Sequence, residues 1–388
     1  MIRGIGIACG HDMDTNVINL FSNAPAANDS GFFGRTCPPA PAAANQFTIE
    51  KNLLSISVSD LSKGLMQAEA ARVRRNEIGR PTWQVMGNRL RAHIVPLLGD
   101  VPAQSFATSD AQRLIDRLGE RGFSSTTIAQ YLVLLRKVVM HGVHIGVLRD
   151  VPAFPKVKVR SQPRGSFSVA EYRAIARTAR SLRGHAHPVL DQLAAGERFW
   201  IARELLAMPD ELPWLIRWMV NTFVRPSDIK LMKHKHIEIV RSKHVYLRMN
   251  LPETKRHSQP IVSLRPAVRV YECLLAHRRE HGFGAADDYL FLPQLKNREH
   301  ALAVLNFLFH WVLEESGLEK GPLGQSRTLY CLRHTAITLR LLYGQGIDML
   351  TLARNARTSV NMVERFYASV LSGEMNVGLL QSRRGRAS

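Results

Sequence analysis

Apolar residues recur at helical spacing through most of the chain after residue 57. Between 124 and 148 they fall on a single helical face, which comprises Ile128, Tyr131, Leu132, Leu135, Val138 and Val139. That spacing is typical of a helix with one side in a hydrophobic core. Similar patterns predict three earlier helices over 59–75, 80–94 and 108–122. Four helices in this span predict a small all-α domain over 58–155.

Polar residues and a proline mark where these helices should begin. Ser59 and Asp60 are the expected cap of the first helix, and Pro81 stands where a first turn tolerates proline. The third helix is expected to begin at Thr108 and to end near Gly122.

A second domain is predicted over 166–375. It opens with Ser168, and Glu171 follows at the spacing of a capping box. Helical patterns continue through "PWLIRWMVNTF", and three short strands follow at 236–240, 244–249 and 260–264. After residue 266 the pattern is again helical. We therefore expect a mainly α fold with a small antiparallel β-sheet, of the α+β class.

The remaining segments lack a regular period. Residues 1–57 are rich in Ala, Asn, Pro and Gly and are expected to form an extended or mobile extension. The stretch "RDVPAFPKVKVRSQPRG" combines three prolines with alternating Lys and Arg, so its part at 156–165 is expected to be a basic interdomain linker. Residues 376–388 are expected to be a C-terminal tail.

A formal net charge of +20 and a pI near 10.4 favour a polyanionic partner. Residues 58–155 hold thirteen Lys and Arg against eight Asp and Glu, and residues 156–388 hold 36 against 20. The excess therefore belongs to the folded parts, which favours a nucleic acid. A membrane surface is the weaker explanation because no basic amphipathic helix has a clean apolar face. The remaining alternative is that the Lys and Arg side chains form solvated surfaces and bind no polyanion.

The cysteines and the hydropathy favour a protein of the reducing cytoplasm. Four cysteines are scattered without CxxC spacing, which argues against a zinc site and against a disulfide framework. The first residues, "MIRGIGIACG", lack a sustained apolar core, and no uncharged apolar run approaches the length of a membrane span. We expect neither a signal peptide nor a membrane helix.

Four places in the second domain set a basic or hydroxyl residue beside a buried pattern. They are Arg225 in "NTFVRPSDIKLM", Lys255 in "ETKRHSQ", Arg333 in "LYCLRHT" and Tyr367 in "SVNMVERFYASV". Each alone has an ordinary explanation: a surface arginine, a solvated turn lysine or an amphipathic core tyrosine. A helix capped by Ser227 or Asp228 is expected directly after the first of them.

Taken in this order after a basic helical domain, the four features resemble the tyrosine recombinase, or phage integrase, family. The resemblance covers roughly residues 58–375. The first part is similar to the core-binding domain, notably at "HIVPLLGDVPAQSF" and "YLVLLRKVVMHGVHIGVL". The second is similar to the catalytic domain through its two arginine boxes, its lysine hairpin and "LARNARTSVNMVERFY".

The resemblance implies roles for individual residues. Tyr367 would attack the scissile phosphate and give a 3′-phosphotyrosyl link with a free 5′-hydroxyl. Arg225 and Arg333 would stabilise the charge on the non-bridging oxygens. Lys255 would protonate the leaving oxygen as general acid, with Lys243 in the preceding turn as its competitor.

A bracing residue and a histidine complete the implied site. Asp228 resembles the acidic residue that supports the first arginine. His334 follows the second arginine, a usual place in the family, and is either structural or a substitute base. No cofactor, metal ion or ATP is implied, because the covalent link stores the energy of the broken bond.

Three positions depart from the commonest family pattern. Tyr330 stands where many relatives carry histidine, Thr358 where many carry histidine or tryptophan, and Arg357 replaces the glycine before the latter. A phenol with a pKa of about 10 is a poor proton acceptor at neutral pH, which leaves the general base unassigned. Both hydroxyls are expected to donate to phosphate oxygens, with slower or differently tuned chemistry. The alternative is a catalytically decayed DNA-binding protein of the same fold.

The resemblance further implies partners and a setting. Double-stranded DNA would be gripped by both domains, with phosphate contacts supplying most of the affinity. A homo-tetramer would act on two sites through a Holliday junction, with accessory DNA-bending or directionality proteins as further partners and no membrane. The expected setting is the cytoplasm, on the nucleoid, and the expected task is to integrate or excise a mobile element.

Overall fold

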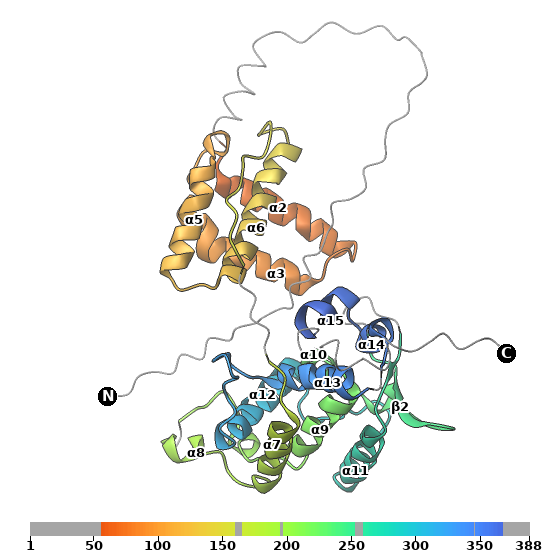
Figure 1. Ribbon diagram of the computed structural model, residues 1–388. Helices are drawn as coiled ribbons and strands as arrows, with labels where there is room; N and C mark the ends of the chain where they lie inside the picture. The colour runs from red at the N-terminus through yellow and green to blue at the C-terminus, as the bar shows by residue number, and fades with distance from the viewer. Residues whose placement is uncertain (1–55, 160–164, 195–196, 253–258, 345, 368–388) are drawn as a thin grey trace, which may run out of the picture. The chain divides into compact units, whose positions relative to one another are not determined.

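The computed structural model describes residues 56–159, 165–194, 197–252, 259–344 and 346–367 (Figure 1). The chain divides into two compact units, one within 1–159 and the other within 160–388. Nearly all of the expected extension at 1–57, half of the expected linker at 156–165, Lys255 and the expected tail at 376–388 lie outside the described residues. Among the described residues no helix is both long and apolar enough to cross a membrane.

The first unit is helical over its described residues, 56–159. Its elements are α2 (Val58–Arg74), α3 (Arg80–Arg89), the π-helical turn η1 (Leu90–Ile94), α4 (Val95–Leu98), the 3₁₀ turn η2 (Ala103–Ser105), α5 (Thr108–Glu120) and α6 (Ser125–His144). The apolar face predicted for α6 is buried at all six positions. α2 packs along α6, and a Cβ on Gly64 would lie 2.7 Å from Nε2 of His141. The absence of a side chain at Gly64 therefore allows these two helices to approach closely.

The helix start expected at Ser59 is wrong by two residues. Ser57 is the N-cap of α2, and its hydroxyl accepts from the backbone N of Asp60 at 3.2 Å while the Asp60 carboxylate accepts from the Ser57 hydroxyl at 2.8 Å. Local hydrogen bonds of this kind decide where a helix begins. The capping box predicted for α7 is confirmed, because Ser168 Oγ accepts from the backbone N of Glu171 and Glu171 Oε2 accepts from the backbone N of Ser168.

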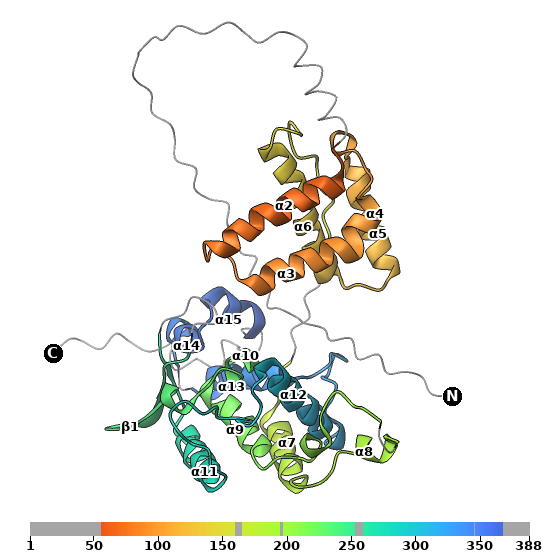
Figure 2. The same cartoon turned by 180° about the vertical axis from the view of Figure 1, so that it is seen from behind.

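In its described residues the second unit is a helical domain with one small sheet. Its helices are α7 (Val169–Ser181), α8 (Val189–Gln192), η3 (Arg203–Leu205), α9 (Leu212–Thr222), α10 (Pro226–Ile229), η4 (His234–His236), α11 (Pro266–Glu280), α12 (Arg298–Glu315), α13 (Leu329–Tyr343), α14 (Met349–Asn355) and α15 (Val360–Tyr367). α9 is the central helix, since it packs against α7, α11, α12 and α13 (Figure 2). Trp218 on α9 is fully buried in the core.

The three predicted strands are confirmed in order and direction. β1 (Ile237–Arg241), β2 (Val245–Met249) and β3 (Ile261–Val262) form an antiparallel sheet of order β1-β2-β3. Leu247 and Met249 of β2 are fully buried, and α11 packs against this strand. The described part of the chain thus has the mainly α, α+β fold that the sequence predicts.

Buried arginines stabilise this core away from any candidate chemistry. Arg278 donates to Oε1 of Glu211 at 2.7 Å, and both side chains are 5% exposed. Arg298 donates to the carbonyl oxygens of Phe291, Leu292 and Lys230. Burial of an arginine in this protein is therefore not by itself a sign of a functional site. The partners of each guanidinium show whether that arginine belongs to a candidate site.

Candidate active site

Arg225 stands at the junction of α9 and α10. α9 ends at Phe223, whose φ of 59° is left-handed, and the chain then turns into α10 with Arg225 as the N-cap. The backbone N of Arg225 donates to Oδ2 of Asp228 at 2.8 Å. The expected cap by Ser227 or Asp228 is therefore wrong in position, because Asp228 binds back to the N-cap from inside the first turn. Arg225 is only 6% exposed.

Arg333 lies on the first turns of α13, which Thr328 caps. Its side chain is buried at 2% exposure, as the inward position in the sequence pattern predicts. The guanidinium donates to the carbonyl oxygens of Phe223 and Ala356. Arg333 thus joins the end of α9 to the turn between α14 and α15, two segments far apart in the sequence.

The turn between α14 and α15 receives both candidate arginines. Arg225 donates to the carbonyl oxygen of Arg357, the residue directly after the Ala356 that accepts from Arg333. Arg357 has a left-handed φ of 52° and is itself 2% exposed. The sequence signal for this unusual residue was the replacement of a glycine, and its burial as a third arginine here was not foreseen. Thr358 follows, half-buried, with its backbone N donating to the Ala353 oxygen at 2.9 Å.

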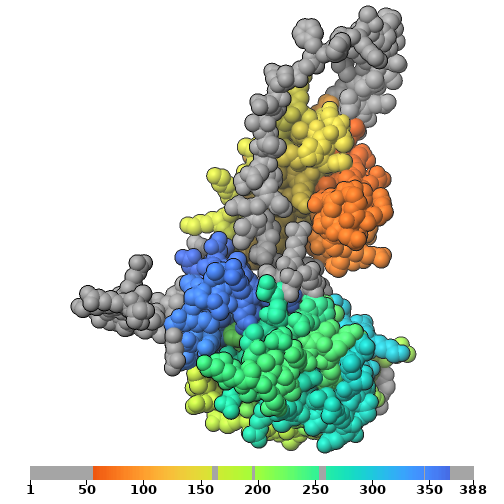
Figure 3. Space-filling view, turned by 90° about the vertical axis from the view of Figure 1, so that its right-hand side faces the viewer, coloured from red at the N-terminus to blue at the C-terminus, as the bar shows by residue number. Residues whose placement is uncertain are grey.

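Tyr367 ends α15 and is packed against the same turn. It is 6% exposed and belongs to one apolar cluster with Phe223, Ala356 and Val363. The two residues whose carbonyl oxygens accept from Arg333 therefore belong to the same apolar cluster as the tyrosine. Figure 3 shows α14 and α15, in blue, at the surface of the second unit. The fold thus brings Arg225, Arg333 and Tyr367 to one place.

His334 lies between two tyrosines. Its ring centroid is 5.0 Å from that of Tyr330 and 5.2 Å from that of Tyr367, with interplanar angles of 59° and 40°. Tyr330 and His334 are half-buried on successive turns of α13, and Tyr367 comes from α15. Sequence spacing relates Tyr330 to His334, but only the packing of α15 adds Tyr367.

Strand β3 of the sheet is hydrogen-bonded to the end of α14, next to this site. The amide of Asn355, at the end of α14, donates to the Val262 oxygen at 2.9 Å and accepts from its backbone N at 2.7 Å. Lys255 precedes β3 and lies outside the described residues, so its position relative to the arginines is not described. Its competitor Lys243 is exposed in the β1–β2 turn.

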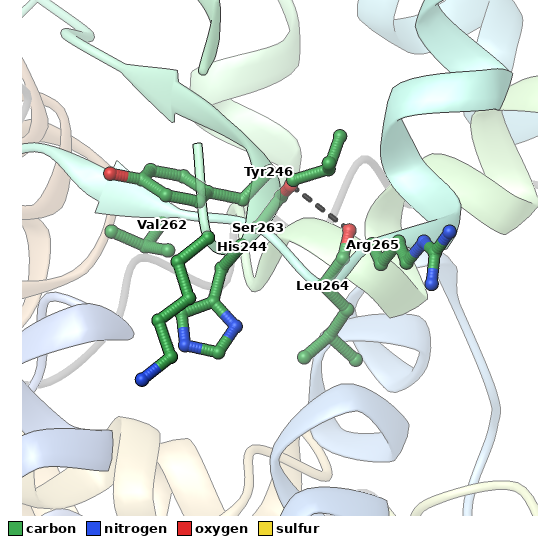
Figure 4. Close-up of a pocket in the computed structure, with 8 residues that line it drawn as sticks. His244, Tyr246, Val262, Ser263, Leu264 and Arg265 are labelled. Carbon is green, nitrogen blue, oxygen red and sulfur yellow. Dashed lines mark hydrogen bonds between the residues drawn. The ribbon is translucent and has the colours of Figure 1, made fainter. Parts of the chain in front are cut away.

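A shallow pocket opens beside this hairpin (Figure 4). Lys243, His244 and Tyr246 line it from the turn and β2, and Val262 and Arg265 line it from β3 and the start of α11. Figure 4 shows the His244 and Arg265 side chains on either side of Leu264. The three basic groups give the pocket a chemistry suited to an anionic ligand.

The start of α13 is held by α7 and the segment before it. Arg327 donates to Oε1 of Glu171 at 2.8 Å, and its guanidinium lies 4.6 Å from the ring centre of Phe167. The backbone N of Phe167 donates to Oγ1 of Thr335 at 2.8 Å. Burial raises the pKa of Glu171, but hydrogen bonds from Ser168 and Arg327 outweigh it and lower the pKa overall. These contacts fix the turn that carries Arg333 and His334.

Potential metal ligands lie elsewhere in the unit. His277, Glu280 and His281 on α11 have ligand atoms within 4.8 Å of one another, and the group is half-buried to exposed. None of these residues is among those that converge on the turn between α14 and α15. The candidate active site is therefore a cluster of arginine, tyrosine, histidine and threonine side chains.

The fold is that of integrases solved with DNA. The Tn1549 transposon integrase in complex with a circular intermediate DNA superposes with a TM-score of 0.58 at 15% identity, covering 84% of this chain and 99% of that one. A lambda integrase dimer bound to a COC′ core site gives 0.58 at 14% identity, covering 83% and 80%. A lambda integrase tetramer bound to a Holliday junction gives 0.56 at 15%, covering 82% and 80%.

Comparison of sequences alone finds no match for this chain. No protein-family model matches the chain, and no curated protein matches its sequence. The fold expected from the ordered arginine, lysine and tyrosine boxes is nevertheless confirmed by the structural neighbours. The chain has the fold of the tyrosine recombinases.

Proposed function

We propose that this protein is a site-specific DNA recombinase that cuts and rejoins DNA through a covalent tyrosine intermediate. The observation that carries the proposal is the convergence of Arg225, Arg333 and Tyr367 on the turn at 356–358. Two guanidinium groups beside a phenol suit a phosphodiester, since planar forks match phosphate oxygens and the phenol supplies a nucleophile.

The chemistry is a pair of transesterifications. Oη of Tyr367 bonds to phosphorus while the bond from phosphorus to the 5′-oxygen breaks, which gives a 3′-phosphotyrosyl link. Arg225 and Arg333 stabilise the charge that gathers on the non-bridging oxygens. Lys255, carried over from the family resemblance, protonates the 5′-oxygen. Attack by a second 5′-hydroxyl reverses these steps and joins the new strand, so that neither ATP nor a metal ion is required.

DNA binding follows from charge. The excess of Lys and Arg in residues 58–155 and 156–388 suits contacts to the phosphate backbone by both units. By analogy with the integrase complexes, the acting form is a tetramer on two DNA sites, and the task is the movement of an element. Accessory DNA-bending or directionality proteins would set the direction of that reaction.

The decisive experiment is the capture of the covalent link. DNA sites are taken from direct repeats flanking the gene or selected from a random pool, and each duplex is nicked so that the cleaved end diffuses away. The native protein should form an adduct that resists denaturant, and Tyr367→Phe should form none. Arg225→Ala and Arg333→Ala should bind the same DNA and cleave it roughly 10²–10³-fold more slowly.

Two results would contradict the proposal. An adduct formed by Tyr367→Phe would mean that another residue is the nucleophile. Specific, steeply salt-dependent binding by the native protein without any adduct would instead identify a DNA-binding protein that has lost its chemistry.

A further inference from the structure

We infer that His334 is the general base that removes the proton from Tyr367. The inference rests on the proposed function and assigns the one role that the family resemblance leaves open. Tyr330 and Thr358 occupy the places where a histidine or tryptophan is usual, and neither a phenol nor an aliphatic hydroxyl is a proton acceptor at neutral pH. Imidazole is the ordinary side chain for that task near pH 7.

The geometry places this imidazole beside the nucleophile. The His334 and Tyr367 ring centroids are 5.2 Å apart at an interplanar angle of 40°. A tilted pair at this separation permits a direct proton transfer, or transfer through one water, after a small side-chain rotation when DNA binds. Tyr367 is only 6% exposed, so bulk water has poor access to its proton. A base supplied by the protein is therefore needed.

The Tyr330 ring makes a second aromatic contact with the His334 imidazole. Its ring centroid lies 5.0 Å from that of His334 on the side of the preceding helical turn. Contacts with two aromatic rings limit the rotation of an imidazole and so help to keep it close to the phenol. Tyr330 thus becomes a positioning residue in this arrangement, which explains why an aromatic residue serves at a place where histidine is common.

Three arginines and a tyrosine are the ionisable groups around this imidazole. On α13 the adjacent Arg333 is cationic, and across the site Arg225 and Arg357 come from α10 and from the turn before α15. Tyr367 is the ionisable group that faces the ring from α15. Cations favour the neutral form of a nearby imidazole, which is the form that a general base needs.

The step is balanced in both directions. As Oη of Tyr367 bonds to phosphorus, its proton moves to a ring nitrogen of His334 while the 5′-oxygen leaves and takes a proton from the general acid. During rejoining, the imidazolium returns that proton to Tyr367 as the phosphotyrosyl bond breaks. No oxidant, reductant or further reactant is consumed.

The test is a pH profile of single-turnover cleavage on the nicked duplex, from about pH 5.5 to 9.5. The native rate should fall at low pH as one imidazole is protonated. His334→Gln keeps a similar shape without a titratable ring, and its rate at pH 7 should be roughly 10²–10⁴-fold lower. The deficit should shrink at the alkaline end of the range, because hydroxide can then remove the phenol proton in place of the imidazole.

Two further variants keep the test decisive. His310 on α12 is 55% exposed and pairs with Glu314, so His310→Gln is a matched control that should retain the native profile. In His334→Ala, added imidazole should restore cleavage, which separates a missing base from a misfolded protein. Tyr330→Phe keeps the flanking ring and should keep the acidic limb of the profile at the native pH.

Each outcome has a distinct meaning. A His334→Gln rate within about threefold of the native rate, with an unchanged acidic limb, would overturn the assignment of His334 while leaving the proposed function intact. Loss of the acidic limb in Tyr330→Phe would mean that the limb depends on the Tyr330 hydroxyl, and it would overturn the assignment of the limb to the His334 imidazole. Absence of an adduct from the native protein at every pH would overturn the proposed function, and the role of His334 with it.

Discussion

Replacement of Arg333 should damage stability and chemistry together. Its guanidinium donates to the carbonyl oxygens of Phe223 and Ala356, and the side chain is 2% exposed. A hydrogen bond from a charged group contributes about 1.5–3 kcal/mol, so Arg333→Ala is expected to lower the free energy of unfolding by about 3–6 kcal/mol. The same change should slow cleavage roughly 10²–10³-fold, because one of the two proposed contacts to the phosphate is lost.

The assay must separate these two effects. Urea unfolding gives the loss of stability, and single-turnover cleavage below the unfolding temperature gives the loss of rate. Arg278→Met is the matched control: it breaks another buried arginine pair, with Glu211, and a broken pair of this kind costs about 3–5 kcal/mol. Because Arg278 lies on α11, this variant should be destabilised to a similar extent and, while folded, should cleave at the native rate.

The reasoning would fail in either of two ways. A stability loss under about 1 kcal/mol in Arg333→Ala would mean that the two carbonyl contacts do not hold the turn at 356–358. Equal slowing of cleavage in Arg278→Met would mean that the rate reports general destabilisation and carries no information on phosphate binding.

Three other predictions concern the turn, the hairpin and acid sensitivity. Arg357→Gly and Arg357→Ala both remove the buried side chain, but only glycine adopts the left-handed φ of 52° without strain. The free energy of unfolding in urea should therefore be higher for the glycine variant by about 1 kcal/mol. Equal stability of the two variants would mean that the backbone at this position is not strained. Asn355→Ala removes both hydrogen bonds to the Val262 backbone and should accelerate hydrogen exchange of the Val262 amide, whereas Leu247, inside the sheet, should stay protected. Burial lowers the pKa of His187 and of His234 in the folded protein. Stability should therefore fall as the pH drops below their unfolded value of about 6.5, because the unfolded chain binds more protons, and His234→Gln should flatten this dependence in thermal unfolding measured between pH 5 and 8.

Local structure was determined by residues close together in the sequence. The six buried positions of α6, the capping box of Ser168 and Glu171, and the three strands follow from periodicity and from interactions within about four residues. The misplaced start of α2 shows the limit of such reasoning. Ser57 and Ser59 are both suitable N-cap residues. Ser57 is the N-cap because its backbone is extended and the Asp60 carboxylate accepts a hydrogen bond from its backbone N.

The ordered boxes were also visible in the sequence, but their geometry was not. Arg333 meets Phe223 across 110 positions of the chain, and Arg225 meets Arg357 across 132. No local period links such residues, and their contact depends on how α13 joins the apolar cluster of α9 to that of α15. The same packing sets His334 against Tyr367. The sequence by itself determined which residues could serve the proposed chemistry, and only the tertiary structure decided which imidazole lies beside Tyr367.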